Sequence, residues 1–249
     1  MEFYKSNAIL RIASVALFFL IWQTASLFIN IELLPSPAEV LLKIIEEAKT
    51  NELFFHTFIT LKRVFISFFI AMFIGTFFGI YMGRNKKLNI FLDDWLVLGL
   101  NVPALVIIIL CYVWFGLNEA AAILAVSLNK IPMVAVIMRE GARSIERDYV
   151  EVAKFYKVNK SKLFFKVIFP QLYPYLLSSA RSGLSLIWKI VLVVELLGRS
   201  NGVGFKLYGF FQFFDISGIL AYTLAFVFLI IIIEFIIVRP FEKKISVWR

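Results

Sequence analysis

The chain has 249 residues, of which 61% are apolar and 17% are charged, and its mean hydropathy is +0.87. An ordinary soluble domain is about 45–50% apolar and about 25% charged, so this chain has too few polar residues to cover a soluble surface. The composition excludes a soluble enzyme, a disordered chain and a nucleic-acid-binding module. It predicts an integral membrane protein, in which the net charge of +9 concerns the placement of Lys and Arg relative to the bilayer.

Cysteine and histidine, which build disulfides and many metal sites, each occur once in the chain. Cys111 is the single cysteine and His56 the single histidine, so neither a disulfide within the chain nor a cluster of thiolate or imidazole ligands can form. We therefore expect no metal site, no bound cofactor and no catalytic residue in this chain.

Six segments are apolar and long enough to cross the roughly 30 Å hydrocarbon layer, which takes about 20 residues. Four are uninterrupted: Ile12–Ile31, Val64–Gly83, Trp95–Asn118 and Ile216–Ile233. Two carry charges: Glu119–Met138 includes Lys130, and Gln171–Gly198 includes Arg181, Lys189 and Glu195. The first apolar core is too long for a secretory signal, and no cleavage pattern of small residues follows it. The sequence thus predicts an all-α membrane protein with six transmembrane helices, the first of them retained.

The basic residues predict the orientation of these spans, because cytoplasmic loops are enriched in Lys and Arg. With both termini in the cytoplasm, that side receives Lys5, Arg11, Arg84, Lys86, Lys87, Arg139, Arg143, Arg147, Lys154, Lys157, Lys160, Lys162, Lys166, Arg239, Lys243, Lys244 and Arg249. The opposite side receives far fewer, and Lys43 and Lys49 there lie among acidic residues. The distribution favours both termini inside the cell.

Ser36–Leu53, outside the first span, is typical of an amphipathic surface helix. Ser36 can cap the helix and Pro37 suits its first turn, and apolar residues then recur at helical spacing opposite Glu and Lys. Such a helix lies on the bilayer or on neighbouring spans, or it contacts an external partner.

Small residues recur every four positions in the second span, at Ala71, Gly75, Gly79 and Gly83. Small residues on one face let helix backbones approach closely in lipid, where packing drives association. We expect this stripe to form a tight helix contact, either within the chain or with a second copy.

The fifth span carries a polar stripe within an arc of roughly 100°. Its members are Ser178, Arg181, Ser182, Ser185 and Lys189. A charge at membrane depth costs at least about 2.5–3.5 kcal/mol, so it normally faces a cavity or a partner. One hypothesis is a translocation path for an anion, to which Lys130 and Glu195 would also belong. The other interpretation is structural: an internal ion pair, for instance with Glu195 or Glu234, or an arginine that reaches the inner membrane interface.

The longest cytoplasmic loop, Arg139–Lys166, has a helical pattern with aromatic residues among charged ones. Tyr149, Phe155 and Tyr156 would be poorly placed in water unless something covers them. The residues alone leave two interpretations open: a docking helix for a cytoplasmic partner, or an interfacial helix on the lipid.

This loop contains a recognisable motif. Residues 151–157 read EVAKFYK, and residues 167–170 read VIFP. They resemble the EAA-x3-G-x9-I-x-L-P signature of permease subunits in ATP-binding-cassette importers, with Glu151, Ala153 and Pro170 matching and Lys157 in place of the usual glycine. Four further segments resemble the nitrate, sulfonate and taurine branch of these permeases: Leu34–Pro37, Leu61–Val64, Trp114–Leu117 and Gly202–Phe205, with Arg181 and Glu195 in the fifth span.

The resemblance implies a type I importer permease in the cell inner membrane. Residues 1–56 would hold the first span and the external helix, residues 57–240 the permease core, and residues 241–249 a cytoplasmic tail. Loop 139–170 would couple to a cytoplasmic ATP-binding subunit, which would hold ATP and Mg²⁺, because this chain has no phosphate-binding loop motif. The coupling residues implied are Tyr149, Glu151, Ala153, Phe155, Tyr156, Lys157 and Pro170.

Further partners follow from the same resemblance. An external solute-binding protein would deliver substrate near Asn201–Phe205, and a second copy of the chain would complete the path as a homodimer in the bilayer. The substrate implied is an organic sulfonate, taurine or a nitrate-like anion; the alternative is a pyrimidine vitamin precursor or riboflavin.

Two other classes are weighed against the importer. A secondary transporter or channel should show inverted repeats or a ring of acids, and intramembrane acids are scarce here. An intramembrane enzyme would need a site such as a Ser185–Lys189 dyad, a spacing that a plain polar stripe also produces.

Overall fold

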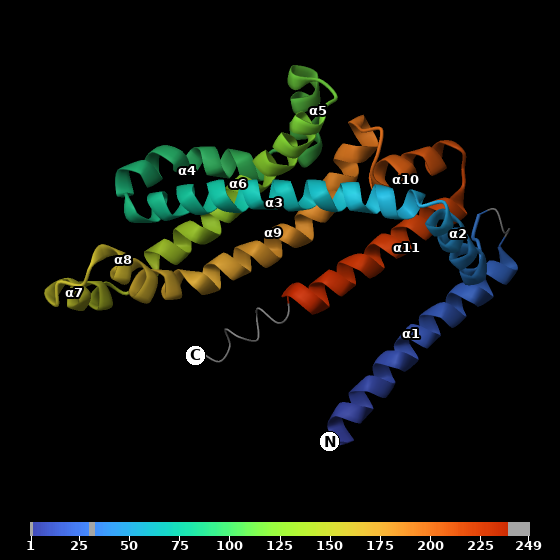
Figure 1. The fold of residues 1–249 in the computed structure, drawn as a ribbon, viewed down its shortest axis with the longest axis horizontal. Coiled ribbons are helices and arrows are strands. Elements are labelled where there is room, and N and C mark those ends of the chain that lie inside the picture. The colour runs from blue at the N-terminus through green and yellow to red at the C-terminus, as the bar shows by residue number, and fades with distance from the viewer. Residues whose placement is uncertain (1, 30–32, 239–249) are drawn as a thin grey trace.

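The computed structural model describes residues 2–29 and 33–238. Within these ranges the chain is helical, which confirms the prediction of an all-α protein (Figure 1). The helices are α1 (Glu2–Phe28), α2 (Pro37–Lys49), α3 (Glu52–Arg84), α4 (Lys86–Asn101), α5 (Ala104–Phe115), α6 (Glu119–Arg143), α7 (Arg147–Phe155), α8 (Lys160–Leu163), α9 (Phe169–Gly198), α10 (Val203–Gln212) and α11 (Ile216–Ile233), with π-helical turns η1 (Phe164–Ile168) and η2 (Glu234–Val238).

Three long helices, α3, α6 and α9, pack together as the centre of the molecule. Small helices gather at its two ends: α7 and α8 at one, α2 and α10 at the other (Figure 1). We call these the α7 end and the α10 end. Helix α11 packs on α2 and α10, and α1 stands away from the centre with its main contact on α2.

The predicted amphipathic helix exists as α2, and its start follows the expected capping chemistry. The amide of Glu39 donates to Ser36 Oγ at 3.3 Å, and the Ser36 amide donates to Glu39 Oε2 at 2.7 Å. The helix ends at Lys49 rather than Leu53, because Asn51 adopts a left-handed conformation with φ of 64°. Helix α3 then begins at once, so the predicted division at residue 56 falls inside α3.

The small-residue stripe lies against α6. A Cβ on Gly75 would sit 2.6 Å from Val134 Cβ, and one on Gly83 would sit 2.6 Å from Ala142 Cβ. A Cβ on Gly79 would meet the carbonyl oxygen of Ala135 in the same way. At these three positions α3 and α6 approach too closely for a side chain on α3, which explains the glycines.

The predicted third span, Trp95–Asn118, is broken in the structure. The segment forms α4 and α5, two helices at 97° to each other. Pro103 lacks an amide hydrogen and crowds the residue before it, so Val102 is extended at φ −69° and ψ 124° and α4 ends. The sequence contains no charged residue between Trp95 and Asn118, so the absence of charge did not mark this break.

Among the residues that the structure describes, three helices are long and apolar enough to cross a membrane: Glu52–Arg84, Glu119–Arg143 and Ile216–Ile236. The bent pair α4 and α5 makes a fourth if it is one span. In the described part of α1 the apolar stretch is the shorter Ala13–Phe28, and α9 carries several charges. The predicted tail 241–249, with the basic residues from Arg239 onward, lies outside the described residues.

Candidate functional site

Helix α7 protrudes at the α7 end and carries the aromatic residues of the predicted coupling motif. The exposed fractions are 83% for Phe155, 74% for Tyr156 and 58% for Tyr149. Glu151 is also exposed, whereas Ala153 is 8% exposed. The main packing of α7 is on η1, so one small residue faces the protein and the large ones face outward.

The loop keeps its turn although the usual glycine is absent. Lys157 adopts a left-handed conformation with φ of 51°. Its amide donates to the Lys154 carbonyl, and the Val158 amide donates to the Ala153 carbonyl, both at 2.9 Å. These two bonds form the Schellman cap that usually ends a helix at glycine, so the motif geometry survives the substitution.

The start of α7 is fastened to α9. The Glu146 amide donates to Gln171 Oε1 at 2.9 Å. Pro170 precedes Gln171 and lies in the first turn of α9, directly after the π-helical turn η1. The motif thus joins the exposed helix α7 to the long helix α9.

The polar stripe lies along α9, mostly on an exposed face. Ser178, Arg181, Ser185 and Lys189 are exposed, and Ser182 is half-buried. Arg181 Nη2 lies 3.4 Å from Glu234 Oε1, so the predicted ion pair with Glu234 is present. Lys189 makes no hydrogen bond or ion pair with any residue the structure describes.

The two other residues assigned to the path lie away from this exposed face. Lys130 is only 7% exposed within α6. Glu195 is 0% exposed and faces a set of polar groups at the far end of α9. The stripe and Glu195 are therefore separate features of α9.

Glu195 belongs to an ionic cluster centred on Arg63, which is 2% exposed. Arg63 Nη1 lies 2.7 Å from Glu195 Oε1. Its Nε and Nη2 donate to the two oxygens of Glu119 at 2.9 and 2.8 Å, a bidentate pair that joins α3 to α6. The same guanidinium donates to the Asn201 carbonyl at 2.8 Å and to the Asn201 side-chain oxygen.

The remaining oxygen of Glu195 holds the start of α10. Glu195 Oε2 accepts from Thr60 Oγ1 at 2.8 Å and from the Gly204 amide at 2.9 Å, and Thr60 Oγ1 accepts from the Val203 amide at 2.8 Å. Gly202, at φ 110°, has no room for a Cβ beside the Glu195 carboxylate. The segment Gly202–Phe205 is thus shaped around a buried carboxylate.

His56 extends the cluster and has no free nitrogen. Its Nδ1 accepts from the Gly202 amide at 2.9 Å, and its Nε2 lies 3.1 Å from Glu52 Oε2. Lys206 Nζ in turn lies 3.2 Å from both Glu52 and Glu47. Both ring nitrogens of His56 therefore contact groups of the protein itself.

The described residues contain no group of three or more His, Cys, Asp or Glu side chains that could hold a metal ion.

The sequence analysis named Glu195 and Gly202–Phe205 but did not connect them with Arg63. The available signal was an arginine at the start of one apolar span and an acid near the end of another, since buried charges need partners.

Comparison with known proteins identifies the family. The family model of the binding-protein-dependent transport system inner membrane component matches residues 71–247. The chain belongs to this family. A protein of Escherichia coli named as an aliphatic sulfonates transport permease is 34% identical over 187 residues, which cover 74% of this chain and 71% of that protein. A Bacillus subtilis protein with the same name is 29% identical over 231 residues, covering 92% and 83%.

The fold also matches a solved transporter. A chain of the MetNI methionine ABC transporter, in an inward-facing conformation, superposes with a TM-score of 0.62 at 19% identity, covering 76% of this chain and 92% of that one. Together these findings confirm the predicted family and branch and a non-catalytic permease subunit of an ABC importer in the inner membrane. They remove the secondary transporter, channel and intramembrane enzyme as alternatives.

Proposed function

We propose that two copies of this chain form the membrane path of an ATP-driven importer for a small anion. Each copy crosses the bilayer six times with both termini in the cytoplasm, so that the α7 end is cytoplasmic and the α10 end external. The support for this orientation is the basic α7 end, where Lys154, Lys157, Lys160, Lys162 and Lys166 lie.

The observation that carries the coupling role is the uncovered aromatic surface of α7. Phe155, Tyr156 and Tyr149 expose large apolar area at a protein end that faces water, where a partner is needed to bury it. The partner is the cytoplasmic ATP-binding subunit, which holds ATP and Mg²⁺, and Glu151 pairs with a basic group on it. Closure of two such subunits on ATP moves α7 and rocks the long helices as rigid bodies.

The cargo is an organic sulfonate, taurine or a nitrate-like anion, delivered by an external solute-binding protein. Lys189 on the exposed face of α9 is a cation without a partner among the described residues, as an anion path requires. The family relatives named for aliphatic sulfonates support the same class. A pyrimidine vitamin precursor or riboflavin is the alternative cargo.

The first test is recovery of partners with the tagged full chain from its native membrane in mild detergent. We expect a stoichiometric P-loop ATPase, and at least tenfold less of it with Glu151→Lys or Phe155→Ala, because buried aromatic anchors contribute about 2 kcal/mol or more. Phe211→Ala is the matched control, since Phe211 is an aromatic residue 61% exposed on α10. Recovery of the folded chain without an ATPase would contradict the coupling role.

The second test measures uptake by the assembled transporter. Lys189→Gln should reduce anion uptake about tenfold, because a hydrogen bond to a charged group contributes about 1.5–3 kcal/mol. Arg181→Gln should reduce it less, since Arg181 is already paired with Glu234. Lys43→Gln, on α2, is the control. Normal uptake by both stripe variants would show that the polar stripe has a structural role and does not contact the substrate. Uptake of a neutral vitamin, with no uptake of anions, would show that the cargo is the vitamin.

A further inference from the structure

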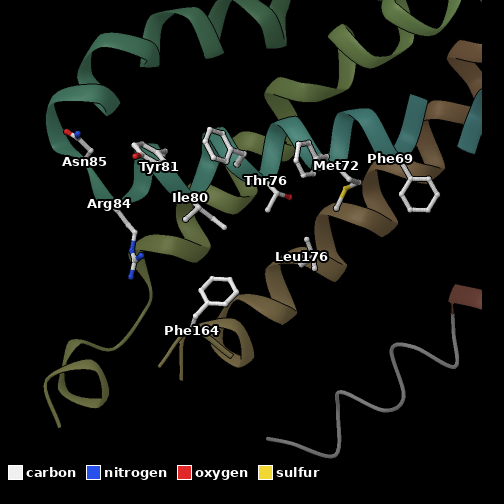
Figure 2. Close-up of a pocket in the computed structure, with 11 residues that line it drawn as sticks. Phe69, Met72, Thr76, Ile80, Tyr81, Arg84, Asn85, Phe164 and Leu176 are labelled. Atoms are coloured by element: carbon white, nitrogen blue, oxygen red, sulfur yellow. The ribbon is translucent and has the colours of Figure 1, made fainter. Parts of the chain in front are cut away.

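A cavity of about 780 Å³ lies between α3, α9 and η1, toward the α7 end (Figure 2). One wall follows α3 from Phe69 to Asn85, and the other contains Phe164 and Leu176. The volume lies within the roughly 300–1,000 Å³ of typical small-molecule sites. None of the polar stripe residues lines it, so the cavity is separate from the proposed path.

The part of the cavity between Phe69 and Ile80 is an apolar zone, and its length along α3 is close to the depth of one bilayer leaflet. Phe69, Phe73 and Phe77 recur every four residues on α3, and their exposed fractions are 65%, 77% and 57%. Met72 and Ile80 continue the same wall. From Phe69 to Ile80 the helix rises about 17 Å at 1.5 Å per residue. One leaflet of a hydrocarbon core of about 30 Å is about 15 Å deep, so the zone matches an acyl chain in length.

The other end of the cavity is polar and positive. Tyr81, Arg84 and Asn85 line it, directly beyond the apolar zone, and Lys86 and Lys87 follow in the chain. Tyrosine at this depth is typical of the membrane interface. Arg84 is exposed and forms no ion pair with a residue the structure describes, and the lining contains no Asp or Glu. An unpaired guanidinium therefore stands where a lipid phosphate would lie.

We propose that this cavity binds an anionic phospholipid. One acyl chain lies along the phenylalanines of α3, and the phosphate accepts hydrogen bonds from Arg84, whose planar guanidinium suits phosphate oxygens. Basic pockets between membrane helices on the cytoplasmic side are suited to such headgroups. The leaflet assigned here rests on the proposed orientation, but the binding itself does not. A second copy of the chain is the other occupant, and the location test distinguishes it.

The affinity test uses the full chain purified in neutral detergent and titrated with dioleoyl phosphatidylglycerol, with bound lipid counted by native mass spectrometry. Arg84→Gln should weaken binding about tenfold, the equivalent of roughly 1.5 kcal/mol, because the variant loses a hydrogen bond between the guanidinium and a charged phosphate. Lys87→Gln removes the same charge three residues away and does not line the cavity, so it should change binding less than twofold. Equal losses in both variants, or equal affinity for phosphatidylcholine, would overturn the site.

The location test uses phosphatidylglycerol with a photoreactive acyl chain. Adducts should appear on peptides that contain Met72 and Leu176 and should fall with Arg84→Gln. A chain with Phe73→Cys and Cys111→Ser distinguishes the other occupant: rapid disulfide formation between two copies would show that a second chain fills the cavity. Lipid binding is measured without transport, so a failure to bind phosphatidylglycerol would leave the importer assignment unchanged. A failure to recover an ATPase would likewise leave the lipid site unchanged.

Discussion

The two ends of the helical centre are built in opposite ways. At the α10 end, Arg63 and Glu195 are 2% and 0% exposed, and their charged atoms bond to groups on α3, α6 and α9. At the α7 end, a short helix rests mainly on η1 and leaves Phe155 83% exposed. At the first end the buried charged groups are paired within one chain, whereas at the second a short helix carries large aromatic side chains that the chain itself does not cover. The proposed coupling would use this difference, because a movement imposed on α7 would be passed to long helices that are tied together at the α10 end.

The largest effect is expected from breaking the ionic cluster. Arg63→Met leaves Glu195 as an uncompensated buried charge, which costs about 3–5 kcal/mol. Thermal unfolding in detergent should show a large loss of stability. Arg143→Gln is the control, because Arg143 and Glu140 are 43% and 50% exposed and such a pair contributes at most about 1 kcal/mol.

A double variant separates charge from packing at the same place. Arg63→Met with Glu195→Gln removes both charges, so it should recover part of the stability that Arg63→Met loses. If the double variant is less stable than the single one, the cluster is held by its hydrogen bonds and shape rather than by charge balance.

A smaller effect is expected on the seam that connects the two ends. Gly79→Ala places a Cβ against the Ala135 carbonyl of α6, and such overpacking costs typically about 1–3 kcal/mol. Gly183→Ala is the matched control on α9, where a Cβ would meet nothing within 4 Å and alanine should stabilise the helix by roughly 0.5–1 kcal/mol. Equal stability of the two variants would mean that α3 and α6 can move apart to accommodate the added methyl group. The close packing of these helices would then not connect the two ends rigidly.

The sequence predicts the parts of this comparison that depend on local pattern. Apolar periodicity identified α2 and the aromatic side of α7. The motif named Ala153, which is the buried residue of α7, and Pro170, which lies in the first turn of α9. Small residues at a spacing of four marked the face of α3 that meets α6. These features are visible because each depends on residues within a few turns of one helix.

The rest depends on contacts that no local pattern records. Arg63 and Glu195 are 132 residues apart in sequence, and a charge in an apolar run is compatible with a path or with a buried pair. The sequence grouped Glu195 with the polar stripe for that reason. The break at Val102 had a local signal, Pro103, but a proline in an apolar run either kinks or ends a helix, and hydropathy does not distinguish the two.

The smallest effect tests the turn that ends α7. Lys157 holds a left-handed conformation that glycine adopts without steric penalty, so Lys157→Gly should stabilise α7 by roughly 1 kcal/mol. Lys154→Gly is the same exchange three residues earlier, inside the helix, where it should destabilise by about 1 kcal/mol. Hydrogen exchange of the α7 amides should slow about fivefold in the first variant and quicken about fivefold in the second, with α10 unchanged in both. Faster exchange in Lys157→Gly would show that this turn does not stabilise the end of α7, and that α7 is not the preformed helix that the proposed docking of an ATPase requires.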